Sequence, residues 1–172
     1  MSLGGGPANG AITSAIADAR EQGTAVIVAS GNENRSPVAF PASDPRAVAV
    51  SAMGRKGTFP AGSTESGDIA RPFGSDKKNF LAAFSNIGPQ TALTSTGVGI
   101  VSTVPLGYAT MSGTSMACPA VTGCAARLLA SRRDILDMAR DQARSDAIVQ
   151  LLFSAAKALG FGTDAEGRGL PS

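Results

Sequence analysis

The sequence predicts an α/β fold of three layers, in which a mostly parallel sheet is flanked by helices. Two short apolar runs, at 25–29 and 47–52, are bounded by turn-forming residues, as strands buried on both faces usually are. Segments with helical spacing of apolar residues lie before and after them, at 11–22 and 115–130. Helices that alternate with continuous apolar strands are typical of parallel sheets covered by helices.

The first helix is predicted at 11–22 and the first strand directly after it. Gly23 suits the position that ends a helix, and the run 25–29 is followed by the turn-rich segment 30–34. The apolar residues at helical spacing are Ile12, Ala15, Ile16 and Ala19. This order predicts one helix–strand unit of the layered fold.

The second strand is predicted at 47–52 and a third at 99–104. Between them, 54–79 is rich in Gly, Ser, Thr, Pro and charged residues and has no sustained period. We expect 54–79 to be a surface excursion. Two interpretations stay open for it, a tolerated loop or a segment that carries specificity or a partner contact.

Two helical regions are predicted in the C-terminal half. The first, at 115–130, contains Pro119, which fits because it lies close to the first turn. The second, at 134–159, is either one longer helix or a helical pair, with an amphipathic stretch at 132–144. Cys118 and Cys124 are six residues apart on the first helix, which places them about 240° apart around its axis and prevents a disulfide between them.

Composition limits the classes of function. The chain of 172 residues suits one domain. Its net charge of +2 and its lack of any basic tract longer than two residues argue against nucleic-acid and membrane binding. No apolar run approaches the ~18 residues of a membrane span, and no basic stretch precedes an apolar one at the N-terminus. We expect a soluble protein without a signal peptide, of unassigned compartment.

The segment 113–123 points to a nucleophilic serine. It reads Gly-Thr-Ser-Met-Ala-Cys-Pro-Ala-Val-Thr-Gly, and it places Ser115 where a predicted helix begins. Unpaired N–H groups and the helix dipole stabilise developing negative charge there. A serine hydroxyl also needs an adjacent base, most often an imidazole, and the chain contains no histidine. The sequence therefore carries one part of a catalytic site.

This segment resembles the active-serine motif of the subtilisin-like serine proteases (peptidase S8). Cys118 stands at a position usually held by a small residue, Ala120 where the motif has His, and Thr122 at a usual Ala position. Further matching segments, in the family's order, lie at 1–6, 29–33, 40–42, 84–89 and 167–170. The resemblance implies that 1–172 is the C-terminal portion of a peptidase domain with a partial subtilisin-like fold, in which about 54–79 is an inserted loop.

The resemblance implies a serine endopeptidase that hydrolyses peptide bonds of a polypeptide substrate. Ser115 would attack the carbonyl, and the Asn32 carboxamide would join the Ser115 backbone N–H in an oxyanion hole. The catalytic Asp and His would come from an N-terminal segment that is missing from this sequence. The chain alone is therefore expected to be inactive.

The resemblance also implies a substrate-binding cleft. Its edge would be an extended segment against which a peptide adds as a strand, and its other wall would line a side-chain pocket. The edge residues are Ser2, Leu3 and Gly4, and the wall residues are Ala29, Ser30 and Gly31.

No metal cluster is predicted from the residues, because the chain has no His, its cysteines diverge and its acidic residues are scattered. The sequence indicates no other cofactor. Relatives of this family bind calcium through loop carbonyls and carboxylates, which makes the loop of Ala42, Ser43 and Asp44 a candidate calcium site.

Two alternatives and one physical consequence stay open. A serine–lysine hydrolase would use Lys56, Lys77, Lys78 or Lys157 as the base. A non-catalytic pseudo-protease or interaction module would use 54–79 or 132–144 as its contact surface. If strands of the parent sheet are missing, an apolar sheet edge is exposed, and we expect self-association through it.

Overall fold

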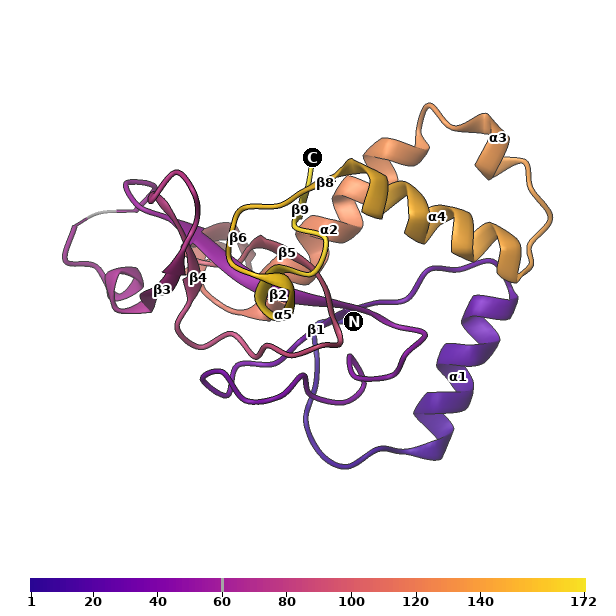
Figure 1. The fold of residues 1–172 in the computed structure, drawn as a ribbon, viewed down its shortest axis with the longest axis horizontal. Coiled ribbons are helices and arrows are strands. Elements are labelled where there is room, and N and C mark those ends of the chain that lie inside the picture. The colour runs from indigo at the N-terminus through magenta and orange to yellow at the C-terminus, as the bar shows by residue number, and fades with distance from the viewer. Residues whose placement is uncertain (60) are drawn as a thin grey trace.

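The computed structural model describes residues 1–59 and 61–172. Figure 1 shows a central sheet with α1, α3 and α4 at one end of the molecule and β3 and β4 at the other. The helices are α1 (Gly10–Glu21), α2 (Thr114–Leu129), α3 (Arg133–Leu136), α4 (Gln142–Ala155), α5 (Thr163–Glu166) and the 3-10 helix η1 (Thr64–Asp68). The strands are β1 (Ile27–Ala29), β2 (Val48–Arg55), β3 (Ile69–Phe73), β4 (Asn79–Ala82), β5 (Thr91–Thr96), β6 (Ile100–Val104), β7 (Gly107–Met111), β8 (Ala156–Lys157) and β9 (Leu170–Pro171).

Three parallel strands form the centre of the sheet. β2 pairs in parallel with β1 on one side and with β5 on the other. Side chains of β2 alternate between the two faces, as the pleat requires. Val50 packs with Val121 of α2 on one face, while Ala49 packs with Val38 of the 30–47 loop on the other. The first two predicted strands are confirmed, and burial on both faces explains their continuous apolar sequences.

The sheet also contains two antiparallel strands. β4 pairs with β2, and β3 forms the outer edge beyond β4. Part of the predicted surface excursion at 54–79 has regular secondary structure, since β3 and η1 lie within it. Sequence periodicity misses β3 because its side chains are only partly buried on either face.

The third predicted strand exists but does not join the central sheet. β6 pairs only with β7, in a two-stranded hairpin that is largely exposed. The third parallel strand is β5, whose sequence Thr-Ala-Leu-Thr-Ser-Thr carries little hydrophobic signal. One of its buried polar side chains finds a partner inside, since the Thr94 hydroxyl donates to the Ser51 carbonyl oxygen, 3.4 Å away.

Local capping explains the helix bounds. Asn9 Oδ1 accepts the N–H groups of Ala11 and Ile12, and Gly23 follows α1 at φ 76°, as the predicted helix end requires. The region 134–159 is a helical pair, α3 and α4, and Asp141 caps the second member by accepting the Arg144 N–H. Among the described residues, no helix is long and apolar enough to cross a bilayer.

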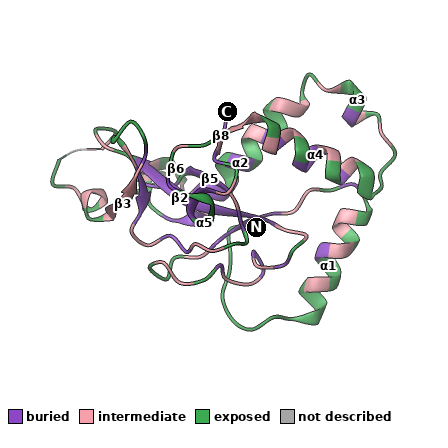
Figure 2. Cartoon of the chain, viewed as in Figure 1, coloured by how far each residue is buried: buried purple, intermediate pink, exposed green. Residues whose placement is uncertain are grey.

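The layers follow from these contacts. α2 packs across β1, β2 and β5, and α4 packs on α2. α5 lies against β5 on the opposite face, where the Ser51 hydroxyl donates to the Ala165 carbonyl oxygen. Figure 2 shows the buried residues concentrated along the sheet, with α1 and the loop before it mostly exposed. The α/β fold with a sheet flanked by helices is confirmed.

Candidate active site

The N-terminus of α2 meets the loop that follows β1. The Thr114 N–H donates to Asn32 Oδ1 at 2.9 Å, and the Thr114 hydroxyl lies 3.0 Å from the same oxygen. Thr114 is fully buried, whereas Asn32 is exposed and Ser115 is half-buried. The fold therefore brings Asn32 next to Ser115, although 82 positions separate Asn32 from Thr114.

The Asn32 carboxamide is oriented by this contact. Oδ1 is held by Thr114, and in the described structure the Nδ2 group has no acceptor. It lies 3.7 Å from the point where a Cβ on Gly113 would stand. The Ser115 N–H, in the first turn of α2, also lacks an acceptor within the described residues. The Ser115 nitrogen lies 3.6 Å from the same point, so two free donors lie near Gly113 at the N-terminus of α2.

Gly31 allows the β1 loop to reach α2. Its N–H donates to Thr114 Oγ1 at 3.2 Å, and its φ of 110° favours glycine. A Cβ at this position would stand 2.4 Å from Asn86 Nδ2. Asn86 is itself buried and fixed, because its Oδ1 accepts the Glu33 N–H at 2.8 Å and its Nδ2 donates to the Pro37 carbonyl oxygen at 3.1 Å.

The N-terminal segment touches the serine directly. The Ser2 hydroxyl donates to the Ser115 carbonyl oxygen at 2.9 Å, and the Ser115 hydroxyl donates to the Ser2 carbonyl oxygen at 3.3 Å. Met1 runs beside β1, because its carbonyl oxygen accepts the Ala29 N–H at 3.1 Å. Ser2, Leu3 and Gly4 are all exposed, and the Gly5 N–H is bonded to the Phe40 carbonyl oxygen.

The opposite wall presents its backbone rather than its side chains. Ala29 and Ser30 are buried, and the Ser30 hydroxyl donates inward to the Asn86 carbonyl oxygen at 3.0 Å. Gly31 is partly exposed. Of these three residues, only Gly31 retains accessible surface for a ligand.

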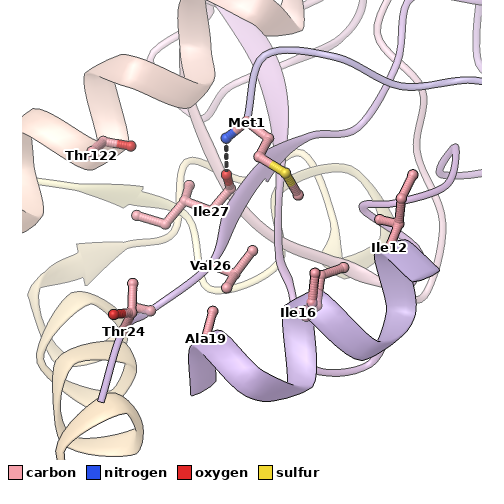
Figure 3. Close-up of a pocket in the computed structure, with 10 residues that line it drawn as sticks. Met1, Ile12, Ile16, Ala19, Thr24, Val26, Ile27 and Thr122 are labelled. Atoms are coloured by element: carbon pink, nitrogen blue, oxygen red, sulfur yellow. Dashed lines mark hydrogen bonds between the residues drawn. The ribbon is translucent and has the colours of Figure 1, made fainter. Parts of the chain in front are cut away.

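An apolar groove of about 450 Å³ lies beside this site, between α1, β1 and Met1. Figure 3 shows Ile12, Ile16 and Ala19 of α1 facing Val26 and Ile27 across it. The Met1 amino group, at the rim, is bonded to the Ile27 carbonyl oxygen. Among the described residues, Met1 alone runs beside this outer edge of β1.

The geometry agrees with a family match that spans almost the whole chain. The model of the subtilase family matches residues 1–169. The chain belongs to the subtilase family. It is similar to alkaline elastase YaB of Bacillus sp. (strain YaB), with 36% identity over 73% of this chain and 28% of the relative. It is also similar to a cuticle-degrading serine protease of Arthrobotrys oligospora, with 33% identity over 86% of this chain and 32% of the relative.

A third relative, subtilisin-like protease 1 of Arthroderma gypseum, is 38% identical over 76% of this chain and 23% of its own length. The subtilase chain therefore spans about a quarter to a third of the length of these three curated relatives.

Among the described residues, no ionisable side chain is hydrogen-bonded to the Ser115 hydroxyl of the subtilase site. The chain contains no histidine, and the Ser115 hydroxyl donates to a backbone carbonyl, which does not take up its proton at neutral pH. Within the described residues, no lysine is hydrogen-bonded to Ser115. Lys56 instead lies over the Phe73 ring, at 3.9 Å from its centroid.

Cys118 occupies a structural position in α2. Its side chain is buried, and its Sγ lies 3.4 Å from the Ile27 carbonyl oxygen and 3.5 Å from that of Met1. Both cysteines are free thiols, as the helical spacing predicts. Cys118 thus fills the space between α2 and β1.

Two charged groups shape the electrostatics near the site. Burial raises the pKa of the Asp68 carboxyl, and the Ser112 hydroxyl, three residues before Ser115, partly opposes this by hydrogen bonding. Burial lowers the pKa of the Arg35 guanidinium, which donates to carbonyl oxygens of β3 and β4. Arg35 thereby ties the loop that carries Asn32 to the antiparallel strands.

The candidate calcium loop does not fit a calcium ion. The carboxylate of Asp44 is paired with the Arg46 guanidinium, at 2.9 Å from Nε and 2.8 Å from Nη2. The pKa of Asp44 is correspondingly lowered, mainly by the hydrogen bond from Arg46. In the described ranges, no group of three or more His, Cys, Asp or Glu side chains is placed to hold a metal ion.

Sequence reasoning missed three residues that build the site. Thr114 positions Asn32, Asn86 supports the loop, and Arg35 anchors it. Thr114 and Asn86 lie inside segments that match the family, so their positions carried a signal. Arg35 carried none, because its role depends on contacts with strands 36 to 47 positions away.

Proposed function

We propose that this chain is the C-terminal portion of a serine endopeptidase domain, with Ser115 as nucleophile. Asn32 Nδ2 and the Ser115 N–H then stabilise the oxyanion of the tetrahedral intermediate. The single observation that carries the proposal is the double hydrogen bond from Thr114 to Asn32 Oδ1, which leaves the Nδ2 donor free near the N-terminus of α2. Family membership and relatives named as proteases support the same chemistry.

The polypeptide substrate would lie along Ser2, Leu3 and Gly4. These residues are exposed and follow Met1, which runs beside β1, so they offer backbone groups for pairing with a peptide in an extended conformation. Gly31 would border the side-chain pocket on the other side. Binding would then use mainly backbone contacts, which do not depend on the identity of the peptide's side chains.

We further propose that the catalytic Asp and His come from a segment N-terminal to this one. The support is chemical, because a serine without a base is a poor nucleophile and this chain has no histidine. The open outer edge of β1 and the apolar groove beside it offer a surface for further chain. The chain alone is then inactive towards peptides.

A fluorophosphonate probe, which reacts with activated serines, tests this proposal. We expect weak labelling of the chain alone and strong labelling after addition of the N-terminal part of a subtilase relative that bears Asp and His. Ser115→Ala should abolish the labelling, while Ser112→Ala, a nearby exposed serine, should keep it. Strong labelling of the chain alone would contradict the need for a second segment.

The second candidate is a non-catalytic interaction module, which the absence of histidine favours. It predicts that no Asp- and His-bearing segment restores labelling of Ser115. The same experiment therefore separates the two functions.

A further inference from the structure

A basic hollow lies on the antiparallel side of the sheet, formed by segments within and next to 54–79. Its volume is about 930 Å³. It is lined by Lys56, Arg71, Pro72, Phe73, Gly74, Ser75 and Lys77. Three of these seven residues are cationic, and none of the seven carries a carboxylate.

The three cations lack acidic partners. In the described parts of the chain, neither Lys56, Arg71 nor Lys77 forms an ion pair. Asp76, the nearest carboxylate in sequence, is engaged elsewhere: Arg55 Nη1 lies 2.6 Å from its Oδ2, and the backbone N–H groups of 78 and 79 donate to its Oδ1. The positive charge of the hollow is therefore uncompensated.

Two of these cationic groups lie over the Phe73 ring. Lys56 Nζ lies 3.9 Å from the ring centroid and Arg71 Cζ lies 5.6 Å from it. Cation–π contact holds such groups in place without neutralising them. The long side chains of Lys56 and Arg71 thus lose less conformational freedom when they bind an anion, because they already converge.

We propose that the basic hollow binds a glutamate- or aspartate-rich segment of a polypeptide partner. Several carboxylates along one segment would satisfy the three cations at once. A second copy of this chain does not fit, because no two acidic residues are adjacent in its sequence. A nucleic acid fits poorly for two reasons. The Phe73 ring has the Lys56 cation over it, which occupies the face on which a base would stack, and three cations are few for a phosphate backbone.

The hollow is coupled by contact to the candidate active site. Arg35 Nη2 donates to the Arg71 carbonyl oxygen at 2.9 Å, and Arg35 lies three residues beyond Asn32. An acidic segment bound here would therefore contact β3, which Arg35 connects to the loop that carries Asn32. The binding itself does not rest on the proposed peptidase function.

Fluorescence anisotropy of the full chain with a labelled oligoglutamate peptide tests the proposal. We expect binding that weakens with added salt, as charge pairing at a surface does, and no comparable binding of an oligoglutamine peptide of the same length. Lys56→Gln and Arg71→Gln should each weaken binding about threefold, and the triple variant with Lys77→Asn about tenfold or more. Asn is used at 77 because φ there is 56°.

Arg140→Gln is the matched control, since it removes one exposed positive charge near the α3–α4 connection, at the far end of the molecule (Figure 1). Its binding should equal that of the unchanged chain. Oligoglutamate should also protect Lys56 and Lys77 of the unchanged chain from amine acylation, a readout that needs no variant. Equal binding of oligoglutamine, tighter binding of an oligothymidylate of matched charge, or unchanged binding by a folded triple variant would each overturn the proposal.

Discussion

At the residue scale, Thr114 positions Asn32, one of the two donors of the candidate oxyanion hole. Its hydroxyl lies between Asn32 Oδ1 and the Gly31 N–H, at 3.0 and 3.2 Å. Its backbone N–H holds the same carboxamide. Because Thr114 is buried, water cannot replace these contacts. The orientation of the Asn32 side chain therefore depends on one neighbouring residue, through its hydroxyl and its backbone N–H.

Replacement of Thr114 by Val should lower the free energy of unfolding by about 1–3 kcal/mol, because the part-buried Gly31 N–H loses its acceptor and Asn32 Oδ1 loses one of its two donors. Urea denaturation followed by circular dichroism measures this. Thr114→Ser keeps the hydroxyl and serves as the control, with a smaller loss expected. Equal stability of the Val variant and the unchanged chain would show that the hydroxyl does not hold the loop.

The Asp76 carboxyl should contribute to stability in a defined pH window. Hydrogen bonds from the Asn79 N–H and from Arg55 lower its pKa from 3.8 to about 2. A carboxyl with a lowered pKa in the folded chain stabilises it above the pKa of the unfolded chain. This contribution is therefore complete above about pH 4 and is lost as the pH falls towards 2.

Asp76→Asn should flatten the pH dependence of unfolding between about pH 4 and 2, measured by urea titrations at a series of pH values. Asp18→Asn, which removes an exposed carboxylate of α1, is the control and should leave the profile unchanged. An identical profile for the Asp76 variant would contradict the assigned hydrogen bonds.

At the element scale, the segment that leads into α5 is held by one buried carboxylate. Glu166 accepts four consecutive backbone N–H groups, from 159 to 162, at 2.6 to 3.3 Å. Phe161 in this segment packs with Met53 and Leu81 of the sheet. The carboxylate thus holds residues 159–162 in place on the face of the sheet opposite α2.

Glu166→Gln should reduce the free energy of unfolding by about 2–3 kcal/mol. The backbone N–H groups would then donate to a neutral oxygen, and the NH2 group of the glutamine would face donors instead of acceptors. Asp164→Asn, in the same helix but exposed, provides the control. Chemical denaturation of both variants measures the difference. Equal losses in the two variants would show that the buried carboxylate has no special role.

At the scale of the whole molecule, the sheet has two different ends. β3 forms the outer edge at one end, and β1 forms an outer edge at the other, where Met1 alone runs beside it in the described residues. The apolar groove lies at this second end, lined by α1 and β1. Apolar surface beside an open strand edge favours association with further chain.

We therefore expect the isolated chain to self-associate through the β1 edge and the apolar groove. Analytical ultracentrifugation should give an average mass above 17.2 kDa that rises with concentration. Ile12→Lys, within the groove, should shift the equilibrium towards the monomer, while Val101→Lys in the exposed β6 hairpin should not. A monomer at every concentration would contradict this expectation.

The strands that the sequence failed to place share a physical cause. β5 is polar in sequence and β3 is only partly buried, so neither shows the hydrophobic pattern by which strands are predicted. Both are strands because a neighbour pairs with them, β5 with β2 and β3 with β4. Pairing between distant segments leaves no periodic signal in either one.

The sequence by itself determined the layered fold class, the two buried strands, the helix at Ser115 and the family, because local periodicity and motifs encode them. Only the tertiary structure decided how the site is assembled. Asn32 and Thr114 are 82 positions apart, and Ser2 and Ser115 are 113 apart. Their contacts arise because β1 and α2 pack together, an arrangement that depends on long-range burial rather than on local sequence.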